Sequence, residues 1–86
     1  MNFSMEERLY LRAWILETLN NDFRGIAHNL AKENGVPDNL IYRMSLFLLQ
    51  EEEMKLKKSL KSQSYEKPET FPFTTERLNS FKEEAT

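Results

Sequence analysis

The single histidine, His28, is the first residue to consider for chemistry, because a catalytic relay or a metal site needs several converging side chains. The chain has no cysteine and no second histidine, so His28 has no thiolate or imidazole with which to form a ligand set or a nucleophilic pair. We expect His28 to face solvent, beside Lys32 one helical turn further on. The acidic run at residues 51–53 is typical of a solvated helix face rather than a magnesium site. We therefore expect no enzyme activity, no metal and no cofactor.

A tight turn between two helices is indicated at Asn34 and Gly35. The position just past the last turn of a helix favours a residue that tolerates positive φ, which glycine does at little steric cost. Pro37 cannot continue the helix, and it pushes Val36 toward an extended conformation. Asp38 suits the N-cap or the first turn of the next helix, where the helix dipole favours a carboxylate.

Residues 26–44 resemble the generic helix-turn-helix motif. The residues that carry the resemblance are a small residue at the helix crossing, a glycine in the turn and three apolar packing positions: Ala31, Gly35, Val36, Ile41 and Met44. In DNA-binding proteins with this motif the second helix enters the major groove. The resemblance implies that Asn39, Tyr42 and Arg43 would contact base edges there.

Charge limits this interpretation. Between Asp22 and Ser45 three basic residues are balanced by three acidic ones, whereas neutralising a DNA backbone takes several cations. The basic cluster that includes Lys55 and Lys58 lies at the far end of the third predicted helix. We interpret this cluster as a solvated helix C-terminus, where lysine also suits the helix dipole.

Capping residues mark where the helices begin. Ser4 and Glu7 form an S-x-x-E capping box, which predicts a first helix from about residue 5 to residue 19. Asp22 can cap a second helix, and a third is predicted over residues 38–60.

The rest of the chain is predicted to be a linker and a tail. Residues 61–73 are polar, contain two prolines and have no period, which favours an extended conformation. Thr74 or Thr75 can then cap a short amphipathic helix. The sequence thus predicts an all-α fold, with a helical domain over residues 1–62 and a linker and tail over residues 63–86. The domain has a three-helix core that contains the helix-turn-helix-like pair and a long third helix.

The third predicted helix carries two apolar faces on nearly opposite sides, at about 100° per residue. One face is expected to cover the first two helices: Leu40, Ile41, Met44, Phe47 and Leu48. The other face, here called the seam, has a coiled-coil spacing that Glu53 interrupts: Tyr42, Leu46, Leu49, Leu56 and Leu60. The same neighbours cannot bury both faces. We expect Tyr10 and Trp14 of the first helix to lie beside the seam.

The tail is a second candidate for partner binding. Four large apolar side chains stand out in its hydrophilic sequence: Phe71, Phe73, Leu78 and Phe81. Aromatic anchors of this kind are typical of short segments that bind another protein. The tail could instead fold back over the seam or exchange with a second copy, and the sequence leaves these alternatives open.

Length and charge set the outer limits. A chain of 86 residues buries only about 60–65% of its unfolded surface, so a monomer would leave apolar helix surface exposed. The net charge of −2 gives no general attraction to nucleic acid or anionic lipid. No apolar run approaches the roughly 20 residues of a membrane span, and acidic Glu6 and Glu7 stand where a signal peptide would be basic. We expect a cytoplasmic location.

These observations predict a small regulatory or adaptor protein that acts through protein–protein contacts, as a homodimer or with a dedicated protein partner. No membrane and no small-molecule substrate is expected. The residues predicted to bind a partner are those of the seam, the two neighbours on the first helix and the four tail residues. The alternative is a helix-turn-helix transcriptional regulator that binds DNA through Asn39, Tyr42, Arg43, Lys55 and Lys58.

Overall fold

A computed structural model describes residues 3–19, 25–60 and 67–85, and only the backbone of residues 52–60 and 84–85. In these ranges the chain forms four helices and no strand, which confirms the predicted all-α fold. The helices are α1 (Met5–Leu19), α2 (Ile26–Glu33), α3 (Asp38–Leu60) and α4 (Thr75–Ala85). None of the helices in the described ranges has the length and hydropathy needed to cross a bilayer.

The capping box at the start of α1 forms as predicted. The Ser4 N–H donates to Glu7 Oε1 at 2.8 Å, and the Glu7 N–H donates to Ser4 Oγ at 3.1 Å. Two backbone donors that the helix itself cannot satisfy are thereby paired. The first helix begins and ends where the sequence placed it.

The second helix begins later than predicted. Asp22, its expected cap, lies outside the described residues, and α2 starts at Ile26 with Gly25 as the N-cap. Glycine has no side chain with which to satisfy the free N–H groups of the first turn. The acceptor comes instead from Glu17 of α1, whose carboxylate binds the Gly25 and Ala27 N–H groups.

The turn between α2 and α3 also forms as predicted. Gly35 has a φ of 69°, the left-handed conformation that glycine adopts most easily. The Val36 N–H donates to the Ala31 carbonyl at 2.9 Å, and the Gly35 N–H donates to the Lys32 carbonyl at 3.0 Å. This pair of bonds defines a Schellman motif. Pro37 then precedes the first turn of α3, in which Asp38 lies.

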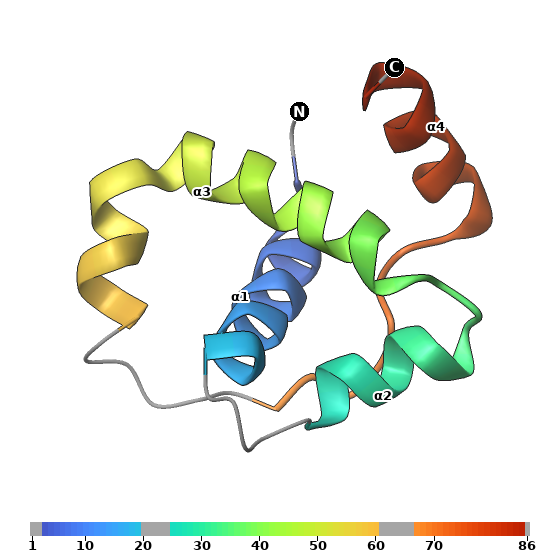
Figure 1. Cartoon of the computed structure of the whole chain (residues 1–86), viewed down its shortest axis with the longest axis horizontal. Coiled ribbons are helices and arrows are strands. Elements are labelled where there is room, and N and C mark those ends of the chain that lie inside the picture. The colour runs from blue at the N-terminus through green and yellow to red at the C-terminus, as the bar shows by residue number, and fades with distance from the viewer. Residues whose placement is uncertain (1–2, 20–24, 61–66, 86) are drawn as a thin grey trace.

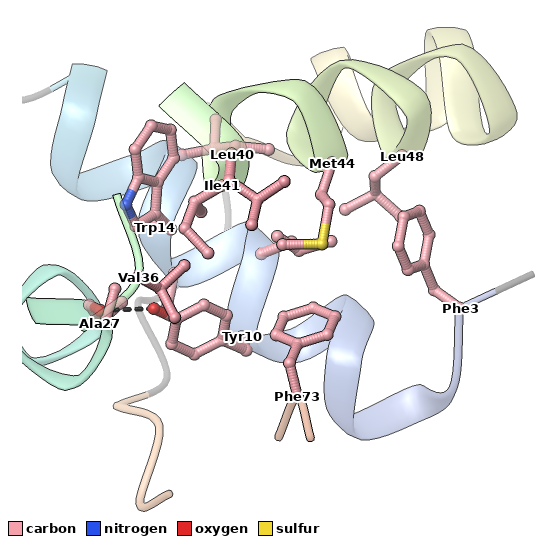
Figure 2. Packing of buried hydrophobic residues seen from close by; sticks show 14 of the residues in the cluster. Phe3, Tyr10, Trp14, Ala27, Val36, Leu40, Ile41, Met44, Leu48 and Phe73 are labelled. Carbon is pink, nitrogen blue, oxygen red and sulfur yellow. Dashed lines mark hydrogen bonds between the residues drawn. The ribbon is translucent and has the colours of Figure 1, made fainter. Parts of the chain in front are cut away.

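The core lies between α1, α2 and the first half of α3 (Figure 1). The inner face of α3 packs there as predicted, with Ile41, Met44 and Leu48 fully buried. Figure 2 shows these side chains above Tyr10 of α1, and Ala27 of α2 beside the Tyr10 hydroxyl. Two alanines of α2, Ala27 and Ala31, are fully buried, and such small side chains allow its backbone to approach its neighbours closely.

Thr74 is the residue that caps α4. Its Oγ1 accepts the Arg77 N–H at 3.1 Å, so the first of the two predicted candidates holds the cap. Residues 67–74 before it are non-helical, as predicted for that part of the linker, and residues 61–66 lie outside the described ranges. In Figure 1 the tail passes from the α1–α2 side of the molecule to α4, which lies near the first half of α3.

Candidate functional site

The outer face of α3 carries the described part of the seam. Tyr42 is 54% exposed and Leu46 is 41% exposed. They lie one helical turn apart, whereas the intervening Met44 is fully buried in the core. Leu49, next along the seam, is half-buried and packs against the core cluster. The side chains of Leu56 and Leu60 lie outside the described residues.

Polar side chains border the two exposed apolar residues. Asn39, Arg43 and Gln50 are all exposed. Helical spacing puts them on the stripe that Tyr42 and Leu46 occupy. The outer face of α3 therefore offers an aromatic ring, an aliphatic side chain and a guanidinium within about two turns.

Tyr10 and Trp14 do not lie on this surface, and the prediction that placed them beside the seam is corrected. Both are almost completely buried. The Tyr10 hydroxyl donates to the Ala27 carbonyl at 2.6 Å, and the Trp14 ring stacks on the His28 ring with centroids 4.7 Å apart. Apolar and charged residues are interspersed around the first helix, so its sequence did not reveal which side α2 would cover.

The Tyr10 hydroxyl also lies in an electrostatic environment that keeps it protonated. Burial removes water from the phenolate form and raises the pKa of Tyr10 far above its ordinary value. The negative charges of Glu17 and Asp38 raise it further. Only a protonated hydroxyl can donate to a backbone carbonyl, so the raised pKa of Tyr10 is consistent with its hydrogen bond to the Ala27 carbonyl.

The tail folds back onto its own chain, but not over the seam. Phe73 and Phe81 are buried, and Phe71 and Leu78 are half-buried. Edge-to-face ring pairs hold the tail: Tyr10 with Phe71 at 5.2 Å, Tyr10 with Phe73 at 5.8 Å, and Phe47 with Phe81 at 5.3 Å. In this conformation the tail aromatics form part of the core and leave Tyr42 and Leu46 open.

A charged contact that the sequence analysis missed also fixes the tail. Arg77 Nε donates to Glu7 Oε2 at 2.9 Å, and Arg77 Nη2 donates to Glu7 Oε1 at 3.3 Å. The guanidinium also lies over the Phe3 ring, 5.8 Å from its centroid. Glu7 thus caps α1 and binds α4 with the same carboxylate.

His28 is buried, which corrects the prediction that it faces solvent. Only 8% of the residue is exposed, and its Nδ1 lies 2.7 Å from Glu17 Oε1. Its Nε2 lies 3.2 Å from Thr18 Oγ1. The ring is therefore enclosed by a carboxylate, a hydroxyl and the stacked indole of Trp14.

Glu17 is the residue that organises this cluster. The residue is 2% exposed, and its carboxylate accepts the Gly25, Ala27 and His28 N–H groups at 3.0–3.1 Å, besides the contact with His28 Nδ1. Sequence analysis missed it, although a signal exists: Glu17 continues the buried stripe of α1, one turn after Trp14 and two turns after Tyr10. A carboxylate on an apolar helix stripe predicts a buried partner.

The surface formed by the described residues includes two hollows. One of about 380 Å³ lies between α2 and the start of α3, with Asn29, Lys32 and Asp38 as its exposed polar lining. The other, of about 280 Å³, lies between α1 and the extended tail segment, bordered by Leu9, Pro68 and Pro72 among others. Each is lined by one lysine and at least one carboxylate. Within the described ranges, no group of three metal-ligating side chains was found.

Comparison of the chain with protein-family models, curated proteins and solved structures finds no match. The helix-turn-helix resemblance therefore stays a hypothesis at the level of the motif. Any functional proposal depends on the geometry of the described residues.

We expect Glu17→Gln to lower the free energy of unfolding by about 3 kcal/mol, because an amide NH₂ would replace an acceptor that faces backbone N–H groups at a buried site. Urea denaturation monitored by circular dichroism measures the change. Glu69→Gln, which alters an exposed carboxylate, is the matched control and should stay within roughly 0.5 kcal/mol of wild type. A Glu17→Gln variant as stable as this control would contradict the organising role of the carboxylate.

The buried Tyr10 hydroxyl predicts a stability loss in alkali. Its folded-state pKa is raised, so its contribution to stability is complete below the unfolded-state value of about 10 and is lost as pH rises above it. Near pH 7 the free energy of unfolding of wild type should exceed that of Tyr10→Phe by about 1 kcal/mol, which is the contribution of the hydrogen bond. That difference should shrink above pH 10 by up to roughly 1.4 kcal/mol per pH unit.

Denaturation at a series of pH values tests this, with Tyr42→Phe as the control because it removes an exposed hydroxyl. The control should keep the alkaline stability loss of wild type. If Tyr10→Phe and wild type lose stability in parallel above pH 10, the assignment to Tyr10 is wrong.

Proposed function

We propose that this chain is a small regulatory or adaptor protein that binds another protein through the outer face of α3. One observation carries the proposal: Tyr42 and Leu46 are exposed one turn apart on a helix whose opposite face forms the core. The tail, which could have covered them, docks elsewhere. Two large apolar side chains therefore remain open to a partner.

The residue types on this face suit a protein interface. Tyrosine and arginine are enriched among residues that dominate binding energy, and Leu46 adds an aliphatic side chain beside them. Asn39 and Gln50 supply the polar border that surrounds the apolar centre of most interfaces. Helical spacing makes the surface a straight ridge, which fits a groove or a second helix.

The partner is a second copy or a dedicated protein. A helix with a seam of this spacing can pair with an identical helix in a symmetric dimer. A short chain that buries a limited core gains stability from such pairing. A cytoplasmic location is part of the proposal, and a chain without cysteines is compatible with it.

Leu46→Asp tests the proposal, because a carboxylate at this seam position would have to be buried unpaired in any apolar interface. We expect the variant to lose self-association in sedimentation velocity, or to lose a partner that wild type retains from its host. Met5→Asp is the matched control, since Met5 is a highly exposed apolar residue at the start of α1 and does not belong to the seam. This variant should self-associate, or retain the partner, as wild type does.

Two results would overturn the proposal. The first is a wild-type chain that stays monomeric and retains no partner. The second is a partner that Leu46→Asp and Met5→Asp bind equally well, because that partner would not use the seam.

DNA binding is the second candidate function. It is supported by the exposure of Asn39, Tyr42 and Arg43 in the first turns of α3, directly after a turn with helix-turn-helix spacing. Asparagine and arginine are suited to reading adenine and guanine edges. A gel shift with duplex DNA that weakens steeply with salt and is lost in Arg43→Ala, but not in Leu46→Asp, would favour this function over protein binding.

A further inference from the structure

The tail and the surface that receives it form a ligand and a binding site within one chain. The site consists of Phe3, Glu7 and Tyr10 at the start of the chain and Phe47 on α3. The tail presents Arg77 to the charged end of this site and Phe81 to the ring of Phe47. We call the site the tail groove.

Charge and aromatic geometry make the fit specific. Arg77 approaches Glu7 through two N–H groups, which fixes its orientation as well as its distance. One turn further along α4, Phe81 meets Phe47 edge to face, with ring planes at 90°. At the other end of the tail, Phe73 meets Tyr10 in the same manner. An occupant of the groove therefore needs a phenylalanine, an arginine and a second phenylalanine in this order.

Most of the described core residues belong to α1, α2 and α3 rather than to the tail. Leu11, Ile41, Met44 and Leu48 are fully buried among α1, α2 and α3, and Tyr10 is tied to Ala27 of α2. Phe73 and Phe81 of the tail complete this cluster. The contacts between tail and groove are made by side chains, so the tail of an identical chain could make the same contacts.

Neither surface is suited to remain open. Phe73 and Phe81 are 5% and 1% exposed, and undocking would expose them together with the groove. Exposed apolar surface on both parts favours re-docking. When two chains open at the same time, each tail meets two equivalent grooves, one on its own body and one on the other copy.

We propose that the tail exchanges between copies, so that two chains form a dimer in which each tail occupies the groove of its partner. This is domain swapping, in which an element of one copy takes the place of the same element in the other copy. Covalent attachment to its own body gives a tail an effective concentration on the order of millimolar at its own groove. The monomer therefore predominates in dilute solution, and the swapped dimer grows with concentration and after unfolding and refolding. The swap uses the tail groove rather than the seam, so it stands independently of the proposed function.

Charge reversal on the two sides of the groove tests the swap. We would prepare full-length Glu7→Arg and Arg77→Glu chains, each also carrying Leu46→Asp to remove association through the seam. Either variant alone places like charges together, in the monomer and in its own swapped dimer. A mixed swapped dimer places opposite charges together at both grooves.

We expect the mixture to form a dimer in sedimentation velocity with an affinity at least about tenfold above that of either variant alone. The control is one chain that carries both Glu7→Arg and Arg77→Glu. Like Glu7→Arg alone, it loses the capping box with Ser4, but it restores the ion pair within a monomer. This control should remain monomeric at the same concentration. A mixture that sediments like its separate components would overturn the proposal.

If circular dichroism finds either reversal variant unfolded, a second measurement applies to the Leu46→Asp chain itself. Isotope-labelled and unlabelled full-length chains are unfolded together, refolded at high concentration and examined by isotope-filtered nuclear Overhauser spectroscopy. We expect contacts between Phe47 of one copy and Phe81 of another. Refolded protein with Phe47–Phe81 contacts only inside each copy would contradict tail exchange.

Discussion

The fold depends on one buried carboxylate, that of Glu17. It binds three backbone N–H groups at the start of α2 and the imidazole of His28, and so fixes the end of α1 to the beginning of the next helix. The helix it caps has 8 residues, too few to be stable by itself in water. The position of α2 in turn sets the place of the Gly35 turn and the direction in which α3 leaves it. The outer face of α3 is therefore oriented, indirectly, by a residue on α1.

A second carboxylate determines which apolar surface stays open. Glu7 completes the cap of α1 and also binds Arg77, so the same group that starts the first helix anchors the tail. With Arg77 held there, the tail aromatics reach Tyr10 and Phe47. The tail thus covers apolar surface on one side of the molecule, and Tyr42 and Leu46 on the other side of α3 are left to solvent.

The sequence predicted the elements well where the signals are local. The Ser4 box, the Gly35 turn and the Thr74 cap each act over a few residues, and each forms as expected. The division of α3 into two faces also follows from helical spacing: Ile41, Met44 and Leu48 are buried and Tyr42 and Leu46 are exposed, whereas Leu49 of the predicted outer face is half-buried against the core.

The sequence could not predict contacts that depend on tertiary structure. Glu7 and Arg77 are separated by 70 positions, and Glu17 acts as a cap only because α2 lies beside it. His28 would face solvent on an isolated helix, but α1 brings Trp14 and Glu17 against it. Tyr10 and Trp14 belong to a helix around which apolar and charged residues are interspersed, so periodicity gave no means of choosing between its faces.

The central claim is that the chain covers Tyr10, Phe73 and Phe81 with its own tail and leaves Tyr42 and Leu46 open. Hydroxyl-radical footprinting of the full chain in dilute solution, read out by mass spectrometry, tests it residue by residue. The account predicts rapid labelling of Tyr42 and Leu46 and strong protection of Tyr10, Phe73 and Phe81. Labelling of Phe81 and Tyr10 as fast as that of Tyr42 would contradict it, because the tail would then leave its groove uncovered.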